Sequence, residues 1–298
     1  MYDTYFGFSE KPFALRPDSR FLFLGQHHMR ALLLLEYGLA NEASFLLITG
    51  EVGAGKTTLI RHLLDRVDKS LVVGLVSNTS RESGRILQWI GLAFGLQVDG
   101  KDDVAVYDEL ARFLIQVYSE GKRALLIVDE AQNLGTVRLE EMRLLSNLNA
   151  DQDFLLQMIL VGQPELRVLM RSPRLRQLAQ RIGTDYHIGR FSEVETIQYV
   201  RHRLSRAGGS PEIFSEGAIR LAHESSRGIP RLINQLCDTA LVYAYAEQRT
   251  GIDADLMSDA IRDRCAGGVF PGRLVAPESR NARPATHTPA VLKAKSLP

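Results

Sequence analysis

The pattern of hydrophobic and polar positions changes character near residue 191. Before that point, short continuous apolar runs alternate with segments whose apolar residues recur at helical spacing. The runs predict five strands, at 45–50, 71–76, 124–130, 154–161 and 184–188. Helices are expected at 28–40, directly after 55, and at 83–94, 104–118, 138–148 and 174–180. Continuous apolar strands separated by helices indicate an α/β fold, with a parallel sheet covered on both faces.

After residue 191 the strand pattern stops and only helical spacing is found. Helices are predicted at 192–205, 215–223, 230–246 and 253–264, and Ser192 with Glu195 has the spacing of a capping box. We expect a small all-helical domain over 191–265. Residues 266–298 hold five prolines and five basic residues against the single acid Glu278, with almost no apolar periodicity. This composition predicts a disordered, basic, proline-rich tail.

The first 25 residues are rich in aromatic side chains and prolines. They are too apolar for a disordered tail, and Pro12 and Pro17 argue against a long helix. We therefore expect an irregular, packed lead-in that covers one edge of a domain spanning 1–190. His27 and His28 open the helix that follows, and for them capping and solvent contacts are favoured over metal ligation.

Overall composition restricts the classes of function. The 298 residues are 45% hydrophobic and 24% charged, which is ordinary for a soluble globular protein. A net charge of +1 gives no argument for binding nucleic acid or an anionic membrane. Cys237 and Cys265 have no metal-binding spacing and fit reduced thiols in the cytoplasm. Without a signal-peptide pattern or an apolar stretch of bilayer length, we expect a cytoplasmic protein, at most peripheral to the inner membrane.

The segment 45–58 carries the clearest chemistry. An apolar run ends at Gly50, a helical pattern begins after Gly55, and between them lies the P-loop pattern G-x-x-x-x-G-K-T. Glycines let backbone N–H groups approach phosphate oxygens, and the N-terminus of the next helix adds unpaired donors. Lys56 would reach the β- and γ-phosphates and the Thr57 hydroxyl would bind Mg²⁺. The alternative is a glycine-rich turn that only joins a strand to a helix. The predicted nucleotide-binding residues are Gly50, Glu51, Val52, Gly53, Ala54, Gly55, Lys56, Thr57 and Thr58.

An acidic pair, Asp129 and Glu130, ends the third predicted strand. The carboxyl ends of parallel strands share one edge, so this pair is expected beside the P-loop. Asp129 would hold Mg²⁺, and Glu130 would orient and deprotonate the attacking water. A solvated strand end is the alternative for a lone Asp-Glu pair, but its place after a P-loop and an apolar strand favours catalysis. These residues predict hydrolysis of a bound nucleotide with Mg²⁺.

Over residues 1–265 the sequence resembles the AAA+ ATPases, in the branch that includes origin-recognition ATPases. Within that branch it resembles the ExeA/GspA-type secretion ATPases, a family with short forms in pilus-biogenesis and exosortase systems. The resemblance rests on the aromatic lead-in with Tyr5, Phe6 and Phe13, on the P-loop, and on segments 128–132, 161–166, 180–182 and 228–234. It implies an AAA+ nucleotide-binding domain over 1–190 and a helical lid over 191–265.

The resemblance also implies roles for single residues. Gln163 matches sensor 1, which contacts the γ-phosphate or the water, and Arg231 matches sensor 2, which closes the lid onto the nucleotide. Arg181 matches a trans-acting arginine finger, which would need a homo-oligomer, with Arg176 as the second candidate for the finger. The plain alternative for each arginine is a surface residue.

Two functions follow from this resemblance. The first is an ATP-driven motor or switch that works with protein partners in assembling a bacterial envelope system for secretion, pilus formation or exopolysaccharide export. The alternative is an ATP-switched DNA-binding protein of the transposition or origin-loading type. Residues 191–265 carry nine Lys/Arg against eleven Asp/Glu, and the basic tail could neutralise a few phosphates but read no sequence. The charge balance separates the two functions only in part. The envelope function is favoured mainly because of the resemblance, for a short form that ends in a cytoplasmic tail.

Overall fold

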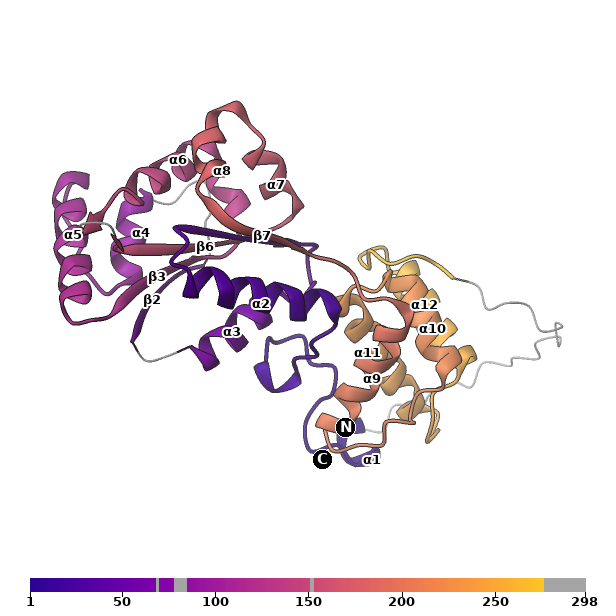
Figure 1. Ribbon diagram of the computed structural model, residues 1–298. Coiled ribbons are helices and arrows are strands. Elements are labelled where there is room, and N and C mark those ends of the chain that lie inside the picture. The colour runs from indigo at the N-terminus through magenta and orange to yellow at the C-terminus, as the bar shows by residue number, and fades with distance from the viewer. Residues whose placement is uncertain (68–69, 78–84, 151–152, 276–298) are drawn as a thin grey trace.

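The computed structural model describes residues 1–67, 70–77, 85–150 and 153–275, and they form a body built on a β-sheet and a helical body beside it (Figure 1). The sheet has the strand order β2-β3-β6-β1-β7, and every neighbouring pair is parallel. Its strands are β1 (Phe45–Gly50), β2 (Leu71–Val76), β3 (Arg123–Val128), β6 (Leu156–Gly162) and β7 (Ile182–Ile188). The predicted α/β fold with a parallel sheet is confirmed.

Alternate residues of the central strands face two helical layers. Leu46 and Ile48 pack with α2 (Gln26–Ala40) and α3 (Lys56–Arg66), whereas Phe45 and Leu47 belong to the core on the other face. Both faces are covered, so the central strands are apolar without alternation. The second layer consists of α4 (Ile86–Ala93), α5 (Asp103–Ser119), α6 (Gly135–Leu145), α7 (Pro164–Met170) and α8 (Arg176–Gln180). The predicted start of α4 at residue 83 lies outside the described residues.

Differences from the expected elements are confined to short segments. The fourth strand of the main sheet begins at Leu156, two residues after the predicted start. Before it, β4 (Asn149–Ala150) and β5 (Asp153–Phe154) pair with each other in an antiparallel ladder. Helix α7 was not expected from the sequence, because its seven residues show too little periodicity to mark a helix.

The helical body contains α9 (Glu193–Arg206), α10 (Glu216–Ser226), α11 (Pro230–Ala246) and α12 (Ala254–Ala266). Its first helix has the expected capping box: the Glu195 N–H donates to Ser192 Oγ at 3.2 Å, and the Ser192 N–H donates to the Glu195 carboxylate at 2.9 Å. Two backbone donors at the helix start are thereby satisfied. The amphipathic faces of the four helices enclose a separate hydrophobic core.

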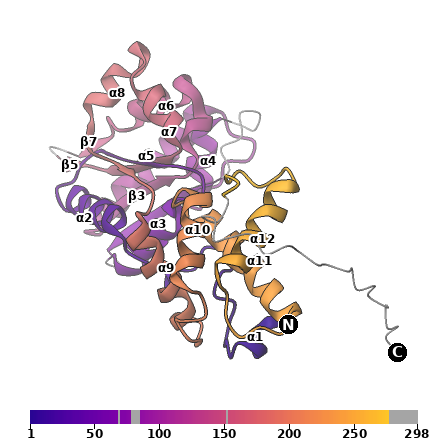
Figure 2. The same ribbon diagram turned by 90° about the vertical axis from the view of Figure 1, so that its right-hand side faces the viewer.

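The N-terminal lead-in packs mainly against the helical body, and it also touches the sheet-based body where Arg61 on α3 donates to the Pro17 carbonyl at 2.9 Å. The expectation that it covers an edge of the 1–190 domain therefore describes only a small part of its packing. The lead-in contains α1 (Tyr2–Tyr5) and the single turn η1 (Ser19–Phe21), and Figures 1 and 2 show α1 beside α11. The Tyr2 hydroxyl donates to Asp238 on α11, and the Phe13 ring meets Phe214 edge-on at 5.8 Å between centroids. Its aromatic residues find their apolar partners in that core rather than on the sheet.

The chain after α12 also packs against the helical body. Phe270 is 9% exposed and joins the core of that body. The Arg273 N–H donates to the Ser225 carbonyl at 2.9 Å, and Ser225 Oγ donates to the Arg273 carbonyl at 2.7 Å. The predicted disordered tail is therefore wrong for residues 266–275, and the rest of it lies outside the described residues. Within the described ranges, no helix has the length and apolarity needed to cross a bilayer.

Candidate nucleotide-binding site

The P-loop joins β1 to α3 at the carboxyl edge of the sheet. Gly53 and Gly55 have φ angles of 81° and 91°, in the left-handed region where a Cβ is strained. The turn formed by these two glycines brings the loop back to the N-terminus of α3, which begins at Lys56. Backbone N–H groups of the loop and of the first turn of α3 thus gather at one point, a geometry suited to phosphate.

Lys56 lies under this loop. Its Nζ donates to the carbonyl oxygens of Gly50 at 2.8 Å and Glu51 at 3.0 Å. The side chain is buried, and this burial lowers the pKa of Lys56, while the nearby Glu130 and Asp129 carboxylates oppose the shift. An ammonium group has three donors, so the third can serve an anion in the loop.

Thr57, in the first turn of α3, and Asp129, directly after β3, meet directly. Thr57 Oγ1 donates to Asp129 Oδ2 at 2.9 Å. A hydroxyl and a carboxylate are hard oxygen ligands of the kind that Mg²⁺ takes, usually with phosphate and water in the remaining positions. No cluster of three or more His, Cys, Asp or Glu occurs in the part of the chain that the structure describes. The pair offers two oxygen ligands that could hold a Mg²⁺ ion brought by a nucleotide.

Glu130 follows Asp129 and lies next to Gln163 at the end of β6. Gln163 Nε2 donates to Glu130 Oε2 at 2.9 Å, and the Glu130 N–H donates to Asp129 Oδ1 at 2.9 Å. Glu130 has a φ of 53°, which is unusual for a residue with a side chain. The structure thus brings together Lys56, Thr57, Asp129, Glu130 and Gln163 at one edge of the sheet.

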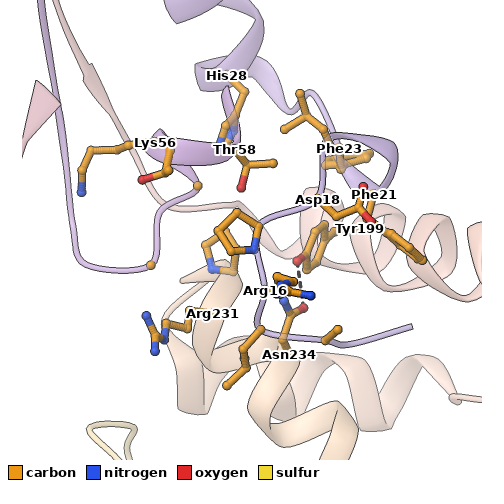
Figure 3. Close-up of a pocket in the computed structure, with 18 of the residues that line it drawn as sticks. Arg16, Asp18, Phe21, Phe23, His28, Lys56, Thr58, Tyr199, Arg231 and Asn234 are labelled. Atoms are coloured by element: carbon orange, nitrogen blue, oxygen red, sulfur yellow. Dashed lines mark hydrogen bonds between the residues drawn. The ribbon is translucent and has the colours of Figure 1, made fainter. Parts of the chain in front are cut away.

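Arg231 approaches the P-loop from the helical body. Its backbone N–H donates to the Gly53 carbonyl at 3.2 Å, and a Cβ added to Gly53 would lie 2.4 Å from the Arg231 Cβ. The side chain is exposed, and in Figure 3 it extends toward the same side of the pocket as Lys56. The N-terminus of α11 is therefore in direct contact with the loop.

A cavity of about 200 Å³ lies between the two bodies. Lys56 and Arg231 lie on one side of it, whereas Phe21, Phe23 and Tyr199 line the other (Figure 3). The aromatic side is held in place by the buried Arg203, whose Nε donates to the Pro12 carbonyl at 2.5 Å. A ligand with an anionic end and a flat apolar end would match both sides.

Two features of this pocket were not expected from the sequence: the lead-in forms one of its walls, and His28 supports the P-loop. His28 is 2% exposed, and its Nε2 donates to the Ala54 carbonyl at 2.8 Å, which fixes the proton on that nitrogen. Burial lowers the pKa of His28 and favours the neutral ring. The expected capping and solvent contacts were wrong for His28. The sequence did carry a signal for the burial of His28, because its spacing from Ala31 and Leu35 places it on the buried face of α2.

Arg181 is not brought to this site within one chain. It ends α8 directly before β7, so it lies at the amino edge of the sheet, and seven extended residues span about 20 Å. Its Nη1 donates to Ser146 Oγ at 2.5 Å and more weakly to the Arg143 carbonyl at 3.4 Å. Arg176, the second candidate for the finger, is exposed at the start of α8. Neither arginine lines the cavity of its own chain.

Comparisons with known proteins agree with this geometry. Residues 40–170 match the family described as AAA domain. The chain is 42% identical over 247 residues to general secretion pathway protein A of Aeromonas hydrophila, covering 83% of this chain and 45% of that protein. It is 25% identical over 259 residues to Holliday junction branch migration complex subunit RuvB of Oleidesulfovibrio alaskensis, covering 83% of this chain and 72% of that one.

Solved structures show the same fold at low sequence identity. The ADP form of the Aeropyrum pernix ORC2 protein superposes with a TM-score of 0.64 at 19% identity, over 86% of this chain and 73% of that one. The Thermotoga maritima RuvB Holliday junction branch migration motor superposes with a TM-score of 0.53 at 18% identity, over 80% and 69%.

Together, the sheet order and the superposed structures show a P-loop fold, and residues 40–170 contain the matched AAA domain. The chain is similar to general secretion pathway protein A over most of its own length, and it spans 45% of the length of that relative.

Proposed function

We propose that this chain binds ATP with Mg²⁺ in the cavity between its two bodies and hydrolyses it there. The observation that carries the proposal is the convergence of Lys56, the Thr57–Asp129 pair and Glu130 at the carboxyl edge of the sheet. Lys56 holds the phosphates, and Thr57 and Asp129 hold Mg²⁺, which neutralises phosphate charge when bound. Glu130 orients the attacking water and accepts its proton.

The remaining site residues act around this centre. Gln163 bonds Glu130 through one amide hydrogen, and its second amide hydrogen is placed to sense the γ-phosphate or the water. Arg231 contacts the nucleotide from α11, whose N-terminus already touches the P-loop, so that bound nucleotide holds the helical body against the loop. The aromatic side of the cavity receives the base, and Gly50 to Thr58 surround the phosphates.

Arg181 acts on the site of a neighbouring copy, since it lies at the opposite edge of the sheet from its own P-loop. A guanidinium placed there by a partner stabilises charge on the γ-phosphate in the transition state. Mixing an Arg181→Ala chain, which keeps its pocket, with a Lys56→Ala chain, which keeps its finger, should restore part of the activity that each lacks. The exposed Arg176 supplies the matched control, because Arg176→Ala should stay active alone.

No rescue in this mixture, with turnover independent of protein concentration, would contradict the shared site. If Arg176→Ala lost its activity instead, and mixing it with Lys56→Ala restored part of that activity, Arg176 rather than Arg181 would be the arginine finger.

We further propose that the ATPase serves the assembly of a bacterial envelope system, in the cytoplasm or at the periphery of the inner membrane. The 42% identity to general secretion pathway protein A supports this function. The match to RuvB supports the alternative function in DNA binding. However, residues 191–265 carry more acidic than basic side chains, which argues against a DNA-binding surface there.

The test is to purify tagged Glu130→Gln protein with ATP from membrane and soluble fractions and to identify what accompanies it. Components of a secretion, pilus or exopolysaccharide-export machine support the proposal. Recovery of DNA instead, with salt-sensitive binding to duplex DNA, would overturn it in favour of the alternative.

A further inference from the structure

A glutamine beside the acidic pair closes a small ring of hydrogen bonds. Gln132 lies in the single turn η2 (Ala131–Leu134) that follows Glu130. Its Nε2 donates to Glu130 Oε2 at 2.5 Å, and its Oε1 accepts the backbone N–H of Gln163 at 3.0 Å. Gln163 Nε2 donates to the same Glu130 oxygen at 2.9 Å. The ring thus joins the carboxyl ends of β3 and β6.

We propose that Gln132 is a positioning residue that sets the orientation of the Glu130 carboxylate and couples it to Gln163. The inference rests on the proposed hydrolysis of ATP, in which Glu130 is the base. It concerns a residue with no direct part in holding phosphate or Mg²⁺.

The side chain at position 132 must donate one hydrogen bond and accept another, and an amide group does both. A backbone N–H can only donate, so the Gln132 atom that faces Gln163 must be the oxygen, and the NH₂ group must face Glu130. A carboxylate at position 132 would keep the acceptor but place two like charges together. Lysine would keep a donor but lose the acceptor, so neither charged residue reproduces both bonds.

Gly162, the last residue of β6, makes room for this amide. A Cβ at Gly162 would lie 2.8 Å from Gln132 Oε1 and 2.7 Å from the Leu166 side chain. Its φ is not in the left-handed region, so space rather than backbone freedom calls for glycine here. The same position gives a second, independent way to displace the Gln132 amide.

Glu130 needs such support because its backbone is strained. A φ of 53° is unfavourable for a residue with a side chain, so the surroundings must hold it in place. The amide groups of Gln132 and Gln163 both donate to one carboxylate oxygen of Glu130, and they thereby restrict rotation about the side-chain bonds of Glu130. A base displaced by about 1 Å can lose about a hundredfold in rate, which is the scale expected for Gln132.

The test compares Gln132→Met, which keeps the length of the side chain but neither bond, with wild type. The matched control is Gln116→Met on α5, where Gln116 Nε2 donates to Glu120 Oε1 at 3.2 Å on the exposed surface. Gln132→Met should bind ATP within about twofold of wild type while kcat falls about 10- to 100-fold. Gly162→Ala should lower kcat in the same direction, and the control should change neither quantity.

A double-mutant cycle separates positioning from a structural effect. In the Glu130→Gln background, Gln132→Met should cause little further loss, because a residue that acts through Glu130 has nothing left to orient. The inference would be overturned if the double variant lost kcat by the product of the two single losses. It would also be overturned if the kcat of Gln132→Met equalled that of Gln116→Met or exceeded that of wild type. Wild-type protein without ATP turnover would instead refute the proposed function itself, and the inference with it.

Discussion

Replacing Gly53 by alanine should separate the helical body from the P-loop. The residue has a φ of 81°, and left-handed backbone costs alanine about 1–2 kcal/mol. The new Cβ would lie 2.4 Å from the Arg231 Cβ, so the contact must open by more than about 1 Å to reach ordinary carbon separations. That movement breaks the 3.2 Å bond from the Arg231 N–H to the Gly53 carbonyl, a further loss of about 1 kcal/mol.

Gly100→Ala is the matched control, since Gly100 has a φ of 74° and nothing within 4 Å of an added Cβ. Both variants should melt a few degrees below wild type, because each carries the backbone strain. Only Gly53→Ala should also weaken ATP binding, with Kd raised about tenfold in a fluorescent-nucleotide titration. Unchanged affinity in Gly53→Ala would refute the contact between α11 and the loop as a part of the site.

Two further predictions concern stability. Burial lowers the pKa of His28, so below about pH 6.5 the unfolded chain takes up this proton more readily than the folded chain, and stability falls. Thermal melting at pH 7.5 and 5.5 should show a smaller acid loss for His28→Gln, and equal losses would contradict the assignment. A chain ending at residue 266 lacks the buried Phe270 and should be about 2 kcal/mol less stable than one ending at 275. Equal denaturant midpoints would show that this segment adds nothing.

The sheet could be predicted because its central strands are buried on both faces, which leaves continuous apolar runs such as 124–128. The P-loop and the acidic pair could be placed at one edge because parallel strands carry their carboxyl ends together. The bond between Thr57 and Asp129 is the direct outcome of that topology. Gln163 was predicted as a site residue from the family resemblance, and in the structure its side chain bonds Glu130.

The packing of the two chain ends could not be predicted in this way. Aromatic residues in the lead-in indicate burial, but their pattern does not say which body covers them, and Phe13 meets Phe214 across 201 positions of sequence. Residues 267–275 are held by Phe270, by the partly buried Val275 and by hydrogen bonds between Arg273 and Ser225, and such contacts leave no periodicity. The two-residue strands β4 and β5 are likewise too short to show a period of two.

The central claim is that Lys56 and Glu130 serve different steps of one reaction, binding and water activation. Its most direct measurement is ATP affinity and ATP turnover, with Mg²⁺, for wild type, Lys56→Ala and Glu130→Gln. Wild type should hydrolyse ATP, Lys56→Ala should bind it poorly, and Glu130→Gln should bind it normally while turnover falls about 10²- to 10⁴-fold. Turnover at the wild-type rate in Glu130→Gln would contradict the account.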